Sequence, residues 1–320
     1  KITYDGYVGI QKASNVLELC NSHEYATMLL EGNFDSYKTH FIQSIDKYGG
    51  SYDDPDFHNW TFGADNDWYD LLLRTAAITN HSLNINGGSE KAVYAVGVSY
   101  LYQDGIMDVD NNYKRLNFRG SVDYDATNWL KVGFNGVFSN STQQVPNNQA
   151  WQKAFNCPPI VALYDEEYND KSFPDKFGSP DAIGYTSTNF LNPIATAKYF
   201  DSSKENYQVL SNFYAQIDFI PGKLNFKTNY SYSFLSTQGR EFTPKYYVSS
   251  WQQSSTTQLT KNENKYYNYI WDNTLTYNDQ WGKHRFGAMA GYSMRQEQWR
   301  MFEGKASNVP DGADEYWYIK

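Results

Sequence analysis

The chain has 320 residues, a net charge of −9, 29 tyrosines and 9 tryptophans. The negative charge argues against a nucleic-acid partner, since phosphate contact needs clustered Lys and Arg. No run of about 18 apolar residues is present, so no membrane helix is predicted. The mean hydropathy of −0.70 is still compatible with a membrane barrel, because half of each barrel strand faces water.

Apolar and polar residues alternate along nine segments, and this period of two predicts β-strands. In one of them, Phe118 and Val122 share an apolar face while Arg119 and Asp123 lie on the opposite face. The predicted strands cover residues 1–11, 78–86, 91–103, 112–124, 129–141, 204–220, 223–236, 265–278 and 283–296.

Helical signals lie between the first two strands. Asn21 followed by Glu24 predicts a capping box that starts a short helix, and residues 68–74 predict a further helical turn. Residues 142–203, which are rich in proline, and the polar residues 237–265 are predicted as long loops.

Connection lengths alternate in step with the predicted strands. Short turns follow the even-numbered strands, near Gly87, Ala126, Pro221 and Gln280, whereas the other connections are mostly long. Antiparallel strands then have all their tight turns at one end, as in outer-membrane barrels. We therefore predict an all-β fold, an antiparallel up-and-down transmembrane β-barrel with short helices in long extracellular loops.

The two faces of these strands predict two surroundings. The apolar face is expected to contact outer-membrane lipids, and the charged face to look into water. A closed, protein-walled interior that contained Phe118, Phe134, Phe213 and Phe226 would contradict this interpretation. The alternative is a secreted or surface β-protein that is rich in aromatic residues and binds or hydrolyses glycans.

The run from Leu83 to Lys91, with Gln103–Ile106, Tyr113–Arg115 and Trp129–Gly133, resembles the early barrel of a known family. This is the SusC/RagA family of TonB-dependent outer-membrane transporters in Bacteroidetes. The resemblance covers about residues 1–141 and weakens beyond them. It implies a 22-stranded barrel with a plug, a TonB box and a SusD-like lipoprotein lid.

No plug, TonB box or closing strand is recognised in the sequence, so we expect an interior barrel fragment of a longer transporter that begins just after the plug. Trp317 to Lys320 are expected to form a loop or the start of another strand. The implied function is active import of a bulky nutrient, with an oligosaccharide preferred over an oligopeptide. The implied partners are the lid and the TonB complex, which acts through the plug.

Two groups of residues are candidates for contact with ligand or partners. Those on the charged face are expected to contact the plug, or else to line the solute path: Arg115, Asn117, Arg119 and Asp123. Aromatic residues of the long loops are expected to stack on sugar rings, to grip the lid or to pack the loops: Trp151, Tyr164 and Trp251.

No catalytic, metal or cofactor site is predicted. The run Asp108–Asn112 lacks the glycine and distal glutamate of a calcium loop, and the five histidines lack metal-ligand spacing. Neighbouring carboxylates at Asp53–Asp54 and 165–167 do not establish the separation that glycosidases need. Pairing of Cys20 with Cys157 stays open.

Overall fold

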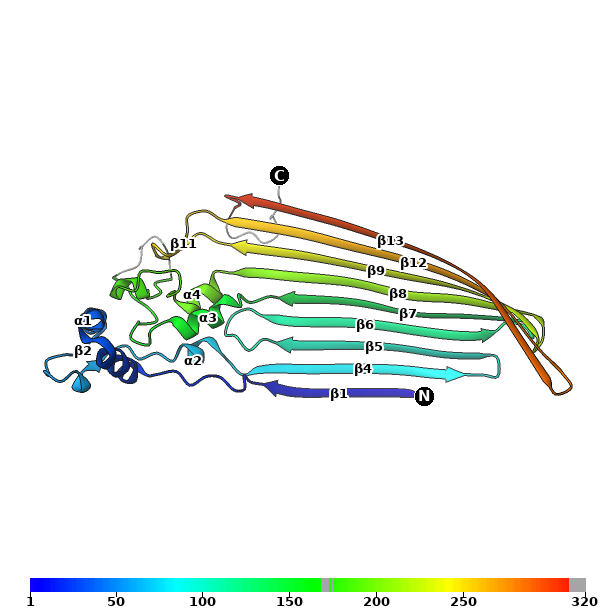
Figure 1. Ribbon diagram of the computed structural model, residues 1–320, viewed down its shortest axis with the longest axis horizontal. Helices are drawn as coiled ribbons and strands as arrows, with labels where there is room; N and C mark the ends of the chain where they lie inside the picture. Colours follow the sequence, from blue (N-terminus) through cyan, green and yellow to red (C-terminus); the bar gives the residue numbers. More distant parts are fainter. Residues whose placement is uncertain (168–172, 174, 311–320) are drawn as a thin grey trace.

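The structure is a computed structural model that describes residues 1–167, 173 and 175–310. Its main feature is one antiparallel sheet of nine strands in the order β1-β4-β5-β6-β7-β8-β9-β12-β13 (Figure 1). This confirms the predicted up-and-down, all-β fold. Within the described residues β1 does not pair with β13, so the sheet is open. Trp317 to Lys320 lie outside the described residues.

Each sheet strand overlaps one predicted segment. The strands are β1 (Ile2–Gln11), β4 (Ala76–Gly88), β5 (Ala92–Asp104), β6 (Asn112–Asp125), β7 (Leu130–Gln144), β8 (Asp201–Ile220), β9 (Leu224–Thr243), β12 (Gln258–Trp281) and β13 (His284–Ser307). Their lengths grow from 10 residues in β1 to 24 residues in β12 and β13.

The long loop predicted over residues 237–265 is wrong. Most of it extends β9 and β12, and between them lies the hairpin of β10 (Tyr246–Ser249) and β11 (Gln252–Ser254). A lipid-crossing strand needs only about 9–11 residues. The extensions therefore project beyond the apolar layer. Apart from the buried pair Phe242 and Leu259, their residues are mostly polar on both faces, so the alternation is lost although the strand pairing continues.

The short turns all lie at one end of the sheet, as predicted. They join β4 to β5, β6 to β7, β8 to β9 and β12 to β13, whereas the helices lie at the opposite end (Figure 1). We call this opposite end the long-loop end.

Helix α1 (Ser22–Tyr48) begins with the predicted capping box. Asn21 Oδ1 accepts from the Glu24 N–H at 2.8 Å, and Glu24 Oε2 accepts from the Asn21 N–H at 3.1 Å. The helix is longer than predicted, because the non-helical residue Asn33 caps a second half by accepting from the Ser36 N–H. The predicted turn near residue 68 is confirmed as α2 (Trp68–Leu72).

The loops at the long-loop end pack into a small globular body, which we call the cap (described residues of 12–75, 145–200 and 244–257). It also contains β2 (Gly50–Ser51), η1 (Phe57–Asn59), β3 (Thr61–Phe62), α3 (Gln149–Asn156), η2 (Pro180–Ile183) and α4 (Pro193–Lys198). Phe41, Trp68, Ile160 and Ile183 are fully buried in its core. Trp68 Nε1 donates to the Pro158 carbonyl at 3.0 Å and joins the first loop to the second. Among the described helices, none combines the length and the apolar character needed to cross a bilayer.

Within the described residues, no second layer covers the apolar face of the sheet. Phe118, Phe134, Phe213 and Phe226 lie on this face and none is buried, with Phe118 48% and Phe213 51% exposed. The rings of Phe134 on β7 and Phe213 on β8 lie side by side, with ring centroids 4.7 Å apart. The closed interior that would contradict the membrane interpretation is therefore not what the structure shows.

The apolar part of each strand does not stay in the same row of paired residues from one edge of the sheet to the other. One row of paired residues starts at Val8 on β1, passes Tyr102 on β5 and reaches Lys114, Glu205 and Glu263 on β6, β8 and β12. Because this row is apolar at its β1 end and charged at its β12 end, it cannot run parallel to the plane of a bilayer. Strands tilted as in a barrel place the apolar parts at one height.

Candidate ligand site and polar face

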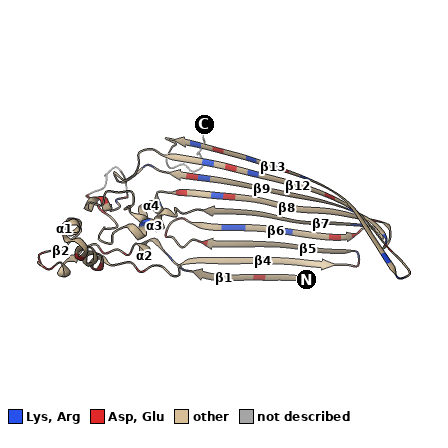
Figure 2. Cartoon of the chain, in the orientation of Figure 1, with Lys and Arg blue, Asp and Glu red and all other residues tan. Residues whose placement is uncertain are grey.

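Four of the predicted site residues share the face of β6 that is opposite Phe118. Arg115, Asn117, Arg119 and Asp123 point to this side, which we call the polar face. Figure 2 shows that charged residues elsewhere in the sheet gather mainly near the long-loop end of β8, β9, β12 and β13. Arg119 and Asp123 therefore lie deeper along the sheet than most of these charges, whereas Arg115 lies level with them.

Arg119 reaches across a whole strand to bind Asn84. Its guanidinium donates to Asn84 Oδ1 on β4, over Gly97 of the intervening strand β5. A Cβ atom at Gly97 would lie 2.6 Å from both Arg119 Nε and Asn84 Oδ1. Glycine is therefore needed at Gly97 for this bridge to form.

Asp123 forms a similar hydrogen bond across an intervening strand, again at a glycine. Tyr214 on β8 donates its hydroxyl proton to Asp123 Oδ1 at 2.6 Å, over Gly133 on β7, where a Cβ would overlap the tyrosine ring. Asn117 Nδ2 donates to Ser99 Oγ at 3.1 Å. Three of the four candidate residues, Asn117, Arg119 and Asp123, thus form hydrogen bonds to neighbouring strands, and contact of the four with a plug or a solute stays a prediction.

A cavity of about 720 Å³ lies where the long-loop end of the polar face meets the cap. Trp151 of α3 forms part of its wall and also packs against Tyr69, with ring centroids 5.1 Å apart. The rest of the lining is rich in side-chain amides: Gln11, Gln103, Asn111, Asn112, Gln143, Gln144 and Asn148.

The amides of this cavity are partly ordered by each other. Gln103 Nε2 donates to Gln11 Oε1 at 2.9 Å, and Gln11 Nε2 donates to the Asp104 carbonyl at 2.5 Å. Asp104 is the one charged residue of the lining, and Arg74 binds its carboxylate at 3.1 Å. These glutamines were not among the residues predicted from sequence, although Gln11 and Gln103 end polar stripes at the long-loop end of their strands.

The structure does not bring the three predicted aromatic residues together. Tyr164 stacks on Phe177 with centroids 5.4 Å apart and lines a separate cavity of about 550 Å³. Trp251 lies in the turn between β10 and β11 and is 46% exposed. Of these three residues, Trp151 is the one that borders the amide-lined cavity.

Other chemical candidates have structural roles. Asp108 pairs with Arg74 at 3.5 Å, and the buried Asp165 pairs with Lys47 at 3.1 Å. No group of metal-binding side chains occurs among the residues that the structure describes. Cys20 is exposed and Cys157 is buried, and the two thiols are unpaired. Burial raises the pKa of Cys157 well above its usual value.

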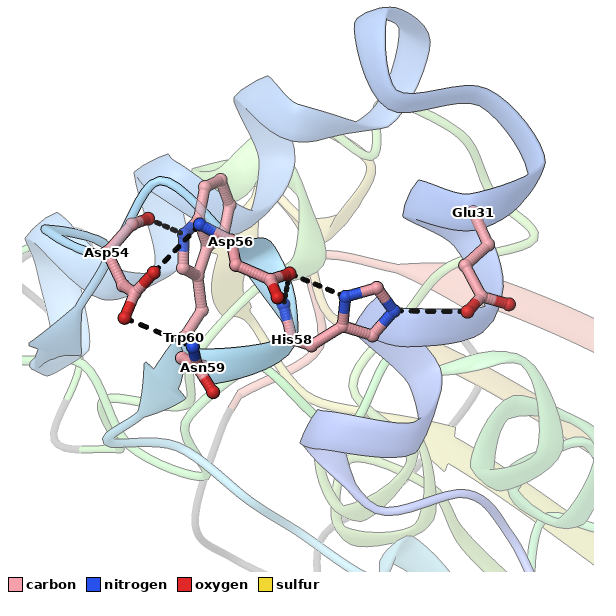
Figure 3. A network of polar contacts seen from close by, with 6 residues as sticks. All are labelled: Glu31, Asp54, Asp56, His58, Asn59 and Trp60. Atoms are coloured by element: carbon pink, nitrogen blue, oxygen red, sulfur yellow. Dashed lines mark hydrogen bonds and ion pairs between the residues drawn. The ribbon is translucent and has the colours of Figure 1, made fainter.

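A polar network closes the outer edge of the cap (Figure 3). His58 Nδ1 lies 2.6 Å from Asp56 Oδ1, and Nε2 lies 3.1 Å from Glu31 Oε1 on α1. Hydrogen bonds to Glu31 and Asp56 raise the pKa of His58. Trp60 Nε1 donates to the Asp54 carbonyl in the same loop.

Comparisons with known proteins agree with this geometry. No family model matches the chain. TonB-dependent receptor P3 of Formosa agariphila is 26% identical over 90% of this chain and 26% of its own length. TonB-dependent receptor SusC of Bacteroides thetaiotaomicron is 32% identical over 32% of this chain and 10% of its own length. The RagAB peptide transporter aligns with a TM-score of 0.74 and 17% identity, over 99% of this chain and 36% of that chain.

The chain is similar in sequence to TonB-dependent receptors, SusC among them, and in fold to a RagAB chain. This confirms the resemblance found in the sequence and the predicted outer-membrane location. The chain spans about a quarter of the length of receptor P3, and the matching RagAB chain shares the fold of the nine-stranded sheet.

Proposed function

We propose that this SusC/RagA-like chain belongs to an outer-membrane importer that takes up a bulky, uncharged oligosaccharide with energy delivered through TonB. Its similarity to TonB-dependent receptors and to SusC supports the transport class. In the proposed mechanism, the cap and a SusD-like lipoprotein lid capture the ligand, and TonB then displaces the plug. The residues of this chain bind and guide the ligand and break no bond.

The proposed ligand class follows from the side chains that line the amide-lined cavity. Side-chain amides both donate and accept hydrogen bonds, as sugar hydroxyls do. The Trp151 ring adds a flat apolar surface of the kind that buries the C–H face of a ring. Asp104 is already bound by Arg74, so the described lining offers no spare charge for a free peptide terminus.

A peptide is the second candidate ligand. The RagAB proteins that share this fold are named as peptide transporters. Main-chain amides of a peptide also suit glutamine and asparagine, so the two ligand classes differ mainly in their charged ends. A binding experiment with both classes separates them.

The test uses the intact transporter that contains this chain, with neutral oligosaccharides and zwitterionic peptides of similar size as ligands in calorimetric titrations. Trp151→Ala is expected to weaken oligosaccharide binding roughly 30-fold, as for a central aromatic contact. Gln143→Ala removes one amide of the cavity wall without touching the packing on Tyr69, and is expected to weaken binding about fivefold.

Trp251→Ala is the matched control, because this tryptophan lies outside the cavity. In transporter purified without the lid lipoprotein, it is expected to leave oligosaccharide affinity unchanged. Stronger binding of peptides than of oligosaccharides, with the same dependence on Gln143, would favour the second candidate. Equal oligosaccharide affinity in all three variants would refute the cavity as the ligand site.

The exposed aromatic residues Tyr164 and Trp251 are proposed to contact the lid. Both lie on the cap, and Tyr164 is 59% exposed. Replacing both with alanine is expected to reduce the amount of lid lipoprotein that co-purifies with the transporter. Unchanged co-purification would assign the two residues to loop packing.

A further inference from the structure

Two cations lie directly opposite each other on the apolar face, at the edge of its apolar band. Lys265 on β12 pairs in register with Arg300 on β13. Tyr267, the next residue of β12 on the same face, belongs to the aromatic part of the band, and its ring lies 5.0 Å from that of Phe234. The Arg300 guanidinium lies 5.8 Å from the centre of the Tyr267 ring.

This arrangement leaves an excess of positive charge. Like charges directly opposite in a sheet are destabilising. Glu263 offsets one charge by pairing with Lys265 at 2.9 Å. Lys261 lies on the same face two positions beyond Glu263, and within the described residues neither Lys261 nor Arg300 forms an ion pair. An external anion would therefore be stabilised here.

The position of these cations along the membrane normal indicates which class of anion they would meet. In outer-membrane barrels the short turns are periplasmic and the long loops extracellular. Lys265 and Arg300 lie on the long-loop side of Tyr267, and aromatic girdles mark the interface between hydrocarbon and water. The cations thus lie level with the head groups of the outer leaflet.

We propose that Lys261, Lys265 and Arg300 bind the phosphate groups of an anionic glycolipid of the outer leaflet. The planar guanidinium of Arg300 suits a phosphate in bidentate geometry, and the lysines add point charges. The apolar band below accepts the acyl chains of the same molecule. This site faces lipid rather than the imported solute, and it is independent of the ligand proposed for the cavity.

The experiment uses the intact transporter, purified in detergent and mixed with bis-phosphorylated lipid A, with retained lipid counted by native mass spectrometry. The double variant Lys265→Gln/Arg300→Gln is expected to bind this lipid roughly 30-fold more weakly, from the usual contribution of each basic residue at a membrane surface. Lipid A without phosphates is expected to bind the unaltered protein as weakly as it binds the double variant.

The matched control is Arg295→Gln/Lys305→Gln, which removes the same charge from the polar face of β13. It is expected to retain lipid A like the unaltered protein. Equal retention by the Lys265/Arg300 variant, or equal retention of lipid A with and without phosphates, would overturn the proposal. Displacement of lipid A by millimolar inorganic phosphate would also overturn it, because the site would then serve a free anion.

Discussion

The cap and the sheet are stabilised in different ways within one chain. The cap has an ordinary core, in which Phe41, Trp68 and Ile160 are inaccessible to solvent. In the sheet, Phe213 and Trp271 remain 51% and 42% exposed on a face that no described part of the chain covers. The cap therefore gains its stability from removing apolar surface from water, while the sheet is expected to need lipid on one face and closed backbone hydrogen bonding.

This comparison explains why exposure has two meanings here. In the cap, an exposed apolar side chain is at a water interface and can be replaced with little effect. On the apolar face, an exposed side chain is expected to contact lipid. Substitutions that distinguish the two regions test the comparison directly.

The largest expected effect is in the cap core. Trp68→Ala removes a fully buried indole and its hydrogen bond to the Pro158 carbonyl, at an expected cost of about 3–5 kcal/mol. Hydrogen exchange should show loss of protection over residues 22–72 and 149–167, while heat-modifiable gel migration of the barrel persists. Trp251→Ala, at an exposed position of the cap, should change stability by less than about 0.5 kcal/mol. Loss of barrel migration with Trp68→Ala would show that the two regions fold as one unit.

The next largest effect is a difference in stability cost between two phenylalanines of similar exposure. Phe213→Arg places a charge in the middle of the apolar part of β8 and should cost about 2–4 kcal/mol in a bilayer. Phe155 on α3 is 56% exposed in the cap, and Phe155→Arg should change stability by less than about 0.5 kcal/mol. Urea titration of the transporter refolded in vesicles measures both values. Equal costs would mean that both residues face the same medium.

The sheet was largely predictable from sequence and the cap was not. The sheet strands repeat a period of two, and its short turns carry local signals such as Pro221–Gly222, so neighbours in sequence are neighbours in space. The cap depends on contacts that no local pattern encodes. Buried Gln252, for example, donates to the carbonyl of Asn192, sixty residues earlier in the chain.

The candidate site was likewise predictable only in part. Alternation placed Arg119 and Asp123 on one face of β6, and the structure does place them there. Their partners Asn84 and Tyr214 lie two strands away, and only the three-dimensional register shows that Gly97 and Gly133 lie between them. The amide-lined cavity needs the cap as its second wall, so strand patterns alone could not locate it.

A smaller effect is expected on the polar face. Gly97→Ala introduces a methyl group into the space used by Arg119 and Asn84, whose flexible ends can move away at the cost of their hydrogen bond. We expect a loss of about 1 kcal/mol in the same urea titration. Gly120→Ala is the control, because a Cβ there meets no atom within 4 Å. A larger cost for Gly120→Ala would show that backbone flexibility, and not the bridge, determines the result.

The smallest effect is a pH dependence confined to the cap edge. Because partners Glu31 and Asp56 raise the pKa of His58 in the folded state, its contribution to local stability is complete below the usual value near 6.5 and is lost as the pH rises through the higher folded value. Amides of residues 50–62 should therefore be more protected from hydrogen exchange at pH 6 than at pH 8, after correction for intrinsic rates. His58→Gln should remove this difference, and His284→Gln, at the short-turn end of the sheet, should retain it. Since His58 is exposed, solvent screens its two partners, and the change should stay within this segment without altering the global unfolding of either region.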